Sequence, residues 1–310
     1  MNVARDPRAL ELRPRSVAIG TFDGVHLGHR AVLGAALAGP CPTVVTFHPH
    51  PRLVLGGEVS LLATLERRLE LFDEAGVDDV LVVEFTTDTA ALPAEEFARD
   101  HLLAIGAERV AAGVGFRFGH KRGGDLDLLR SLGLDVVEVP LVEGVSSTRI
   151  RELAAAGEVA GAAALLGRPL EVEGTVVGGD HRGTGLGFPT ANLEVPAGLV
   201  VPTFGIYAGA VGERRAAVSI GVNPHYGGTE RRIEAFLLDW SGDLYGRRLV
   251  LELWEKLRDE RSFESEAALV EQIARDVEAT RAATRPRKFS AGPASQPPWT
   301  PRGPLFRWSA

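Results

Sequence analysis

The organisation of this chain follows from one stretch, Val17-Ala18-Ile19-Gly20-Thr21-Phe22-Asp23-Gly24-Val25-His26-Leu27-Gly28-His29. Its first three residues are apolar and β-compatible, and the residues after His29 are typical of a helix, so the stretch predicts a strand, a tight loop and a helix start. His26 and His29 then stand at a helix N-terminus, where free backbone N–H groups and the positive end of the helix dipole favour anions. Imidazoles at that place can hold phosphate oxygens and stabilise charge that develops on a phosphorus under attack.

Other interpretations of this loop are possible from its residues. The loop lacks the G-x-x-x-x-G-K-[ST] pattern of a Walker A motif, which argues against ATP hydrolysis of that kind. Zinc can bind two histidines, but no cysteine or nearby acidic pair completes a credible site. A structural role stays open, because an H-x-x-H pair by itself is a weak signal.

Length, composition and charge limit the class of protein. The 310 residues allow two domains or one large one, and 45% hydrophobic and 24% charged residues are ordinary for a globular chain. A net charge of −7 argues against nucleic acid as the main partner, because nucleic-acid-binding proteins usually carry a basic face. Cys41 is the only cysteine, so no intramolecular disulfide can form, which suits a reducing cytoplasm. We expect neither a secretory signal nor a membrane span, since no apolar run is long enough.

From residue 17 to about 140, apolar strands alternate with helical patterns. The expected strands are 43–47, 80–85, 110–113 and 136–139, and the expected helices are 65–75, 94–105 and 126–132. This alternation predicts an α/β fold, a doubly wound parallel sheet with helices on both faces. Ligands of such sheets bind at the carboxyl ends of the strands, which is where the histidine loop lies.

Two further loops follow strands and are expected at the same edge of the sheet. Residues 47–51 read Phe-His-Pro-His-Pro, and residues 113–125 combine glycines and a basic cluster with the aromatic pair Phe116 and Phe118. The second loop suits a flat ring beside a phosphate. A rigid proline turn and a surface loop with solvated charges are the alternative interpretations, and the residues alone do not decide between them.

A helix start is expected in the segment 145–153, which reads V-S-S-T-R-I-R-E-L. Serine and threonine are common N-caps, so capping alone explains these residues. A helix N-terminus with hydroxyls and arginines is also able to hold a polyphosphate. Alanine-rich helices follow over 152–166, with Gly157 dividing them.

The pattern changes after Gly167, where strands become short and are separated by Gly, Pro and Asp. The expected strands are 170–177, 205–211, 215–220, 232–239 and 247–253, followed by a helix at 264–279. Short strands at this spacing predict an antiparallel β-barrel. We therefore expect an α/β domain at 1–167, a barrel domain at 168–284 and a disordered, Pro-rich tail at 285–310.

Two features of the expected barrel domain suggest phosphate chemistry. Residues 179–192 are glycine-rich, so that backbone N–H groups near Gly179 and Gly183 can cover phosphates. Thr190 and Asn192 place two neutral oxygens close together, which is a reasonable contact for Mg²⁺ and phosphate. A long hairpin loop is the alternative interpretation.

Glu234 lies within the strand expected at 232–239, on the same face as Phe236 and Leu238. A carboxylate on an apolar face needs a reason, and action as a general base is one. A buried ion pair with an arginine is the alternative, which the strand by itself slightly favours.

Together these motifs resemble those of a known enzyme family. The stretches G-x-F-D-G-V-H-x-G-H at 20–29 and S-S-T-x-x-R at 146–151 resemble the two signature elements of nucleotidyltransferases. P-T-A-N at 189–192, after G-D-x-R-G, resembles the riboflavin kinase barrel, and the order over residues 15–283 is similar to that of bacterial bifunctional riboflavin kinase/FAD synthetases. The resemblance implies that riboflavin and ATP give FMN and ADP in the barrel, and that FMN and ATP give FAD and pyrophosphate in the α/β domain.

The resemblance also implies roles for individual residues. Glu234 would take the proton from the riboflavin 5′-hydroxyl. His26 and His29 would stabilise α-phosphoryl transfer, in which the FMN phosphate is the nucleophile and needs no base. In the barrel, the resemblance implies that Mg²⁺ and ATP contact Thr190 and Asn192, and that phosphate contacts Gly179 and Gly183. In the α/β domain, it implies that pyrophosphate contacts Ser147, Thr148 and Arg151, and that the adenine side contacts Phe22, Gly24 and the 47–51 loop. The flavin of that domain would contact Phe116, Phe118 and Asp125.

Three positions depart from the family pattern. Gly115 stands where Asn or Asp is frequent, His48 where an acidic residue is common, and Phe236 where His is frequent. We expect activity to survive, because the phosphate-handling residues are present. Two alternatives remain, a nucleotidyltransferase for another acceptor and a flavin-binding regulator that has lost catalysis.

Overall fold

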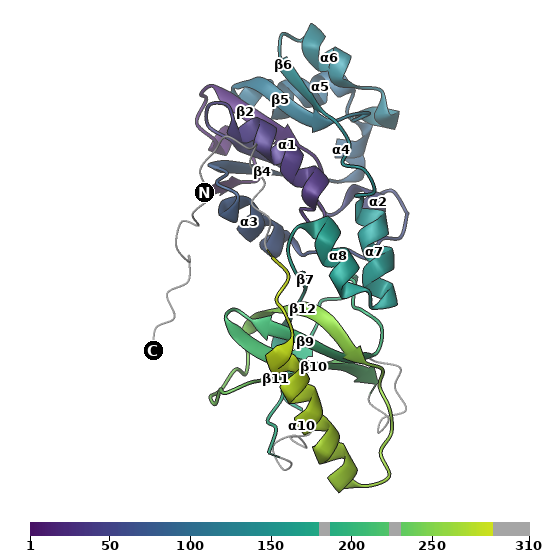
Figure 1. Ribbon diagram of the computed structural model, residues 1–310. Coiled ribbons are helices and arrows are strands. Elements are labelled where there is room, and N and C mark those ends of the chain that lie inside the picture. The colour runs from purple at the N-terminus through teal and green to yellow at the C-terminus, as the bar shows by residue number, and fades with distance from the viewer. Residues whose placement is uncertain (180–186, 223–230, 288–310) are drawn as a thin grey trace. The chain divides into compact units, whose positions relative to one another are not determined.

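A computed structural model describes residues 1–179, 187–222 and 231–287. Within this range the chain forms two compact units, one made of residues 1–59 with 64–145 and the other of residues 60–63 with 146 onward (Figure 1). Gly183 and the segment 288–310 lie outside the described residues, so the expectations for the loop glycine and for most of the tail stay predictions.

The first unit contains the predicted parallel sheet. Its six strands run in the order β1-β4-β3-β2-β5-β6, and every neighbouring pair is parallel. The strands are β1 (Asn2–Ala4), β2 (Arg15–Ile19), β3 (Thr43–His48), β4 (Asp79–Glu84), β5 (Ala107–Gly113) and β6 (Asp135–Val139). The doubly wound α/β prediction is therefore confirmed, and the short β1 is an addition to it.

Helices cover both faces of this sheet because strand side chains alternate between two hydrophobic cores. Ala18 packs with Leu33 and Phe72 in one core, whereas Val17 and Ile19 belong to the other. The α-helices are α1 (Leu27–Leu37), α2 (Pro51–Val54), α3 (Leu65–Glu74), α4 (Thr87–Ala91), α5 (Ala94–His101) and α6 (Leu126–Ser131), and the 3₁₀ turns are Pro7–Ala9, Leu103–Ile105 and His120–Arg122.

One predicted helix is wrong in its extent. The expected helix 94–105 ends at His101, and a 3₁₀ turn at Leu103–Ile105 leads into Gly106. Gly106 has a φ of 81°, and a Cβ there would lie 2.2 Å from the carbonyl oxygen of Arg13. The chain turns at this position because only glycine combines that backbone conformation with so close an approach.

The second unit contains the predicted antiparallel barrel. Its strands close in the order β10-β11-β8-β7-β12-β9, and all neighbouring pairs are antiparallel. They are β7 (Leu170–Val177), β8 (Ala191–Glu194), β9 (Gly205–Val211), β10 (Arg214–Val222), β11 (Arg231–Leu237) and β12 (Arg248–Arg258). The barrel prediction is confirmed, although β8 lies where the sequence suggested part of a glycine-rich loop.

The described residues of the second unit also form the helices α7 (Ser147–Ala156), α8 (Val159–Leu166) and α10 (Glu266–Ala282). Gly157 separates α7 from α8 with a left-handed φ of 80°, as expected, and α7 begins within the segment 145–153, where the sequence predicts a helix start. The expected boundary near Gly167 stays a prediction. In the structure α7 and α8 belong to the same compact unit as the barrel.

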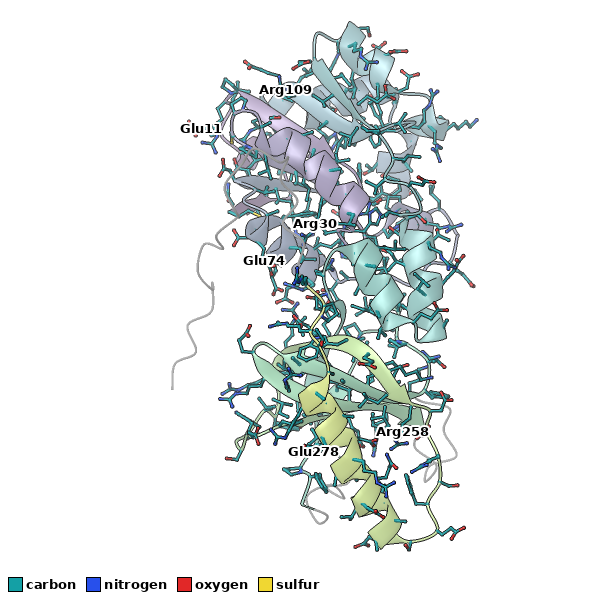
Figure 2. All side chains as sticks on the ribbon, viewed as in Figure 1. Glu11, Arg30, Glu74, Arg109, Arg258 and Glu278 are labelled. Carbon is teal, nitrogen blue, oxygen red and sulfur yellow. The ribbon has the colours of Figure 1, made fainter. Side chains whose placement is uncertain are left out.

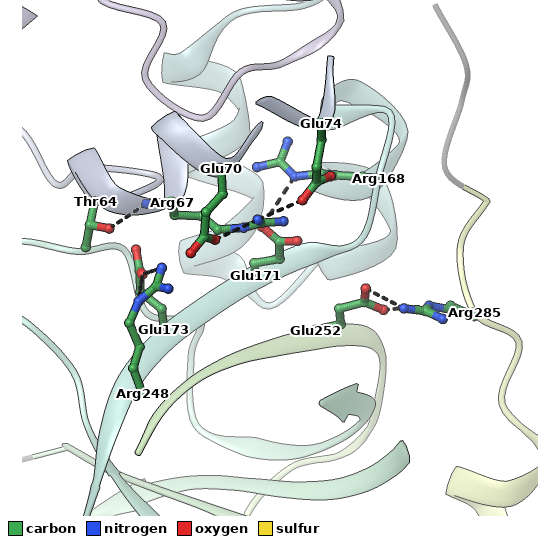
Figure 3. Close-up of polar contacts among 10 residues, drawn as sticks. All are labelled: Thr64, Arg67, Glu70, Glu74, Arg168, Glu171, Glu173, Arg248, Glu252 and Arg285. Atoms are coloured by element: carbon green, nitrogen blue, oxygen red, sulfur yellow. Dashed lines mark hydrogen bonds and ion pairs between the residues drawn. The ribbon is translucent and has the colours of Figure 1, made fainter. Parts of the chain in front are cut away.

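The C-terminal helix α10 is fixed to the barrel by arginine contacts. Arg258 of β12 forms a two-pronged ion pair with Asp276 of α10, with Nη2 to Oδ2 at 2.7 Å, and Figure 2 labels this arginine. After the helix, Arg285 pairs with Glu252 at 2.7 Å, as Figure 3 shows. The chain is therefore still ordered on the barrel at residue 285, within the segment predicted as a disordered tail.

Candidate active sites

His26 caps the helix that follows the signature loop. Its Nδ1 accepts a hydrogen bond from the backbone N–H of His29 at 3.2 Å, so α1 begins directly after the loop. An Nδ1 that accepts must be unprotonated, and the neutral ring therefore carries its proton on Nε2. His26 can present Nε2–H as a hydrogen-bond donor to an anion at the helix N-terminus.

The two histidines of the motif lie against each other and are supported from the core. Their rings stack with centroids 3.5 Å apart and planes 14° apart. The Phe22 ring meets His29 edge-on at 5.4 Å and Phe72 of α3 at 5.7 Å. Because Phe22 is only 1% exposed, its side chain positions His29, and any contact of residue 22 with a nucleotide would come from its backbone.

The loop backbone is unusual at three of the four positions from 22 to 25. Phe22, Gly24 and Val25 have φ angles of 52°, 81° and 41°, and the N–H of Val25 donates to the carbonyl of Phe22 at 3.1 Å. Positive φ is uncommon for an aromatic residue and more so for a β-branched one, and such strain gathers at functional loops. Gly24 is thus required by the turn itself, in addition to any contact with ATP.

The 47–51 loop follows β3 at the same edge of the sheet as the histidine loop. The His48–Pro49 peptide bond is cis, and His50 caps α2 by accepting from the N–H of Arg52 at 3.1 Å. Burial lowers the pKa of His48, and the positive charges of Arg68 and Arg5 lower that pKa further. The rigid proline turn of the sequence analysis is therefore present, and it carries a histidine that favours its neutral form.

The 113–125 loop brings the two predicted flavin aromatics together. Phe116 and Phe118 stack with centroids 5.7 Å apart, and Phe118 is buried against Phe97. Gly115 has a φ of 73°. Asn and Asp are the residues other than glycine that best tolerate this left-handed conformation, so the departure at 115 preserves the backbone shape. Phe116, which is partly exposed, remains the aromatic side chain available to a flat ligand.

Asp125 has a structural role as well as an implied flavin contact. Its Oδ1 accepts from the backbone N–H of Leu128 at 3.0 Å and so caps α6. Oδ2 pairs with Arg117 at 2.8 Å. The bond from Leu128 is the largest cause of the lowered pKa of Asp125, and the charge of Arg117 adds to it. Asp125 is therefore held as a carboxylate by its own loop and helix.

The second signature element opens α7, in the second compact unit. Ser146 is the N-cap and accepts from the N–H of Arg149 at 3.1 Å, which leaves Ser147 and Thr148 in the first turn. The Nε of Arg151 donates to the carbonyl of Ser60 at 2.7 Å. The capping interpretation is thus correct for Ser146, while the hydroxyls of Ser147 and Thr148 lie at a helix N-terminus suited to anions.

The barrel brings two of its predicted site residues together. Asn192 of β8 and Glu234 of β11 are direct cross-strand partners, and Ser219 of β10 is the partner of Glu234 on the other side. Directly paired residues of antiparallel strands project to the same face, with Cβ atoms about 5 Å apart. The three strands therefore present an amide, a carboxylate and a hydroxyl in one row.

Glu234 lies on the outer face of the strand and not on the interior one. Ile233, Ala235 and Leu237 fill the barrel core, whereas the Glu234 side chain is 31% exposed. The face it shares with Phe236 is half-open, and Phe236 meets Phe188 edge-on at 5.4 Å. Glu234 forms the expected arginine pair, to Arg232 at 3.3 Å, but the pair is only partly buried.

Asn192 is partly buried in this row. Its Oδ1 is buried and accepts no hydrogen bond from the residues that the structure describes. Gly179 packs so closely on it that a Cβ at 179 would lie 2.1 Å from Asn192 Nδ2. A buried amide oxygen without a donor is costly unless a ligand or ion satisfies it. This oxygen, with Thr190 two residues earlier, fits the oxygen ligands that Mg²⁺ prefers.

Sequence reasoning missed three polar residues of these sites. Ser219 and Arg232 flank Glu234 through strand register and ion pairing, and Arg68 of α3 contacts the ends of β2 and β3. Alternation along β11 would have placed Arg232 beside Glu234, whereas nothing local to 65–75 indicates a role for Arg68.

Two features are absent from the part of the chain that the structure describes. No group of three or more His, Cys, Asp or Glu side chains is placed to hold a metal ion. None of the helices there is both long enough and apolar enough to cross a membrane.

Comparison with known proteins matches both units. Residues 9–151 match the family model described as FAD synthetase, and residues 166–284 match that described as riboflavin kinase. A bifunctional riboflavin kinase/FMN adenylyltransferase from Listeria monocytogenes is 35% identical over 286 residues, which are 86% of this chain and 91% of that protein. Its counterpart in Escherichia coli K12 is 38% identical over 281 residues, 84% and 90% of the two chains.

A solved structure also covers both units. The crystal structure described as a macrolide-efflux protein from Streptococcus pneumoniae is 30% identical, with a TM-score of 0.79. The match covers 90% of this chain and 98% of that one. The same arrangement of elements is therefore found in an experimentally determined protein.

Proposed function

The chain belongs to the bifunctional riboflavin kinase/FMN adenylyltransferase family, and from this premise we propose that each unit carries one of the two reactions at the residues described above. The barrel phosphorylates riboflavin to FMN, and the parallel-sheet unit transfers an adenylyl group from ATP to FMN. The observation that carries the proposal is the cross-strand pairing of Asn192 with Glu234, because a carboxylate next to an amide supports a general base acting beside a group that binds phosphate.

In the kinase reaction Glu234 acts as the general base. Its carboxylate removes the proton from the riboflavin 5′-hydroxyl while that oxygen bonds to the γ-phosphorus of ATP. The bond between the γ-phosphorus and the bridging oxygen breaks, and ADP leaves. The ion pair with Arg232 supports this role, because it holds the carboxylate on the open face of β11.

We propose that Thr190 and Asn192 hold Mg²⁺ together with the phosphates of ATP. The buried Oδ1 of Asn192 supports this assignment, because its hydrogen-bonding capacity is not used by the described residues. Mg²⁺ bound there supplies positive charge that neutralises the phosphate oxygens. Gly179 leaves the space that this arrangement needs on the other side of the amide.

In the adenylyl transfer the nucleophile is the phosphate of FMN. One of its oxygens bonds to the α-phosphorus of ATP, the bond to the bridging oxygen breaks, and pyrophosphate leaves, so no proton has to be removed. His26 and His29 donate hydrogen bonds to the α-phosphoryl oxygens as charge develops there. We assign Ser147, Thr148 and Arg151 to the outgoing pyrophosphate, as the family resemblance implies.

We also assign the enzyme to the cytoplasm, which the unpaired Cys41 thiol supports.

Replacing Gly179 by alanine tests the barrel assignment. The new Cβ must displace the Asn192 amide, so we expect riboflavin phosphorylation to fall by about 10-fold and to require more Mg²⁺, in line with the usual effect of disturbing a metal ligand. Both reactions are measured in one preparation over a Mg²⁺ titration, with FMN supplied directly for the second. Adenylyl transfer should not change.

Gly178 provides the matched control, because a Cβ there meets only Tyr245 at 3.9 Å, an ordinary contact. Gly178→Ala should therefore leave both reactions and the Mg²⁺ requirement as they are. Asn192→Ala, which removes the amide outright, should reproduce the defect of Gly179→Ala. Normal phosphorylation in Asn192→Ala at low Mg²⁺ would show that the metal is held elsewhere.

A further inference from the structure

Arg68 is a buried cation that none of the proposed steps uses. It lies on α3, outside both signature motifs, and only 5% of it is exposed. Its hydrogen bonds go to uncharged groups, and among the described residues no carboxylate lies within ion-pair distance of it. Burial lowers the pKa of Arg68, and the more distant charge of Asp23 acts against that change. A guanidinium in this state needs a reason, since a buried charge without a partner is costly.

The contacts of Arg68 join the carboxyl ends of two neighbouring strands. Its Nη1 donates to the carbonyl of Thr21 at 2.6 Å, in the loop after β2, and to Thr46 Oγ1 at 3.2 Å. Its Nη2 donates to the carbonyl of Phe47 at 3.4 Å, at the end of β3. Thr46 Oγ1 itself donates to the Thr21 carbonyl at 3.2 Å. One guanidinium therefore sets the spacing between the histidine loop and the 47–51 loop.

Helix α3 also supports the histidine pair through a second residue. Phe72, one helical turn after Arg68, packs edge-on against Phe22, and Phe22 packs against His29. Residues four apart lie on one face of a helix, so Arg68 and Phe72 both contact the loop that follows β2. Arg68 holds the backbone of the loop at Thr21. Phe72 packs against Phe22, the side chain that supports His29.

The charge of Arg68 also acts at the carboxyl edge of the sheet, at the end of β3. Burial is the largest cause of the lowered pKa of His48, the last residue of β3, and the charges of Arg68 and then Arg5 lower that pKa further. The positive potential therefore extends to the sheet edge at which ligands of parallel sheets bind. An anion placed there would add a close counter-charge to the more distant one of Asp23.

We propose that Arg68 is a positioning residue for adenylyl transfer, which fixes the histidine loop against the 47–51 loop and directs a buried positive charge at the triphosphate of ATP. The proposal rests on the assignment of adenylyl transfer to this unit. It predicts two separable effects, one on the geometry of the reacting groups and one on the affinity for ATP.

The test uses the full chain with Arg68→Met and Arg68→Lys. Arg68→Met removes both the fork and the charge, so kcat for FMN adenylylation should fall by about 100-fold, as small misplacements of reacting groups do, and KM for ATP should rise. Arg68→Lys keeps the charge but not the forked contacts. Arg68→Lys should retain a KM for ATP close to that of the unaltered chain. Its kcat should lie between that of the unaltered chain and that of Arg68→Met.

Arg67→Met is the matched control. Arg67 is the preceding residue of α3, is 7% exposed, and has ion pairs with Glu70 and Glu74 of its own helix at 2.9 Å. Its loss removes a buried arginine without touching the loop contacts, so it should leave kcat and KM for ATP near normal. Riboflavin phosphorylation, measured in every preparation, gives the amount of active barrel unit, and Arg67→Met controls for the effect of losing a buried arginine on the parallel-sheet unit.

A second readout follows the charge directly. The pKa of His48, measured by NMR titration, should rise in Arg68→Met and stay in place in Arg68→Lys, because only the first removes the nearby positive charge. If Arg68→Met does not fold, the kcat and KM of Arg68→Lys decide the question by themselves. Kinetic constants for Arg68→Met or Arg68→Lys that match those of Arg67→Met would overturn the proposal. If the unaltered chain makes no FAD from FMN, the assignment of adenylyl transfer has itself failed.

Discussion

Replacing Glu234 by glutamine should lower kcat for riboflavin phosphorylation by about 10²–10⁴-fold, the usual contribution of a general base. Glutamine keeps the shape of the side chain, and it stays opposite Asn192 in the strand register. It cannot accept the proton of the 5′-hydroxyl, so the loss falls on the chemical step and not on ATP binding. FMN supplied directly should still be converted to FAD at the normal rate.

Glu194→Gln is the control for this substitution. Glu194 lies on β8, the strand that pairs with β11, and its side chain is exposed. The same isosteric change there removes a surface charge from the barrel without altering the row formed by Ser219, Glu234 and Asn192. Equal rates of phosphorylation in Glu234→Gln and Glu194→Gln would rule out Glu234 as the base.

Replacing His29 by alanine should have the opposite pattern. FAD formation from FMN should fall by about 10²–10³-fold, the effect of removing one donor to a developing charge. The loss has two parts, since His29 is itself a donor and its ring also stacks on His26 at 3.5 Å. Riboflavin phosphorylation should be unchanged, because the barrel residues lie in the other compact unit.

His101→Ala removes a comparable ring from the same unit. The His101 imidazole stacks on Phe97 with centroids 4.5 Å apart and lies outside both signature motifs. It should cost some stability and leave both reactions in place. A His29→Ala protein that loses the two activities in equal measure would point to general unfolding and against two independent sites.

The local parts of this structure were accessible from the sequence. His26 and His29 are three residues apart at a strand-to-helix turn, so their proximity depends only on the helix beginning where the apolar run indicates. The alternation of strands and helices gave the parallel sheet, and the short strands after Gly167 gave the barrel. These features depend on residue periodicity, which a single segment contains.

The remaining parts depend on contacts between distant segments. Arg68 reaches Thr21 and Phe47 from a helix whose own pattern is that of an ordinary amphipathic segment. The pairing of Asn192 with Glu234 requires the register of β8 with β11, and β8 itself is hidden among loop residues. Gly106, at which the chain turns after the segment 94–105, lies against the Arg13 backbone, and this contact is with a segment far back in the chain.

The position of Phe22 illustrates the same limit. The motif suggests that it contacts the nucleotide, whereas its ring is buried against Phe72 and supports His29. A motif identifies which residues act together, but burial decides whether a side chain touches a ligand or holds one that does.

A product time course tests the central claim most directly. The full chain is incubated with riboflavin, ATP and Mg²⁺, and riboflavin, FMN and FAD are separated by chromatography at intervals. We predict that FMN appears first and FAD follows, and that FMN supplied alone is converted without a lag. If neither product forms from riboflavin and supplied FMN is also unconverted, the two-site account is contradicted and a flavin-binding role without catalysis takes its place.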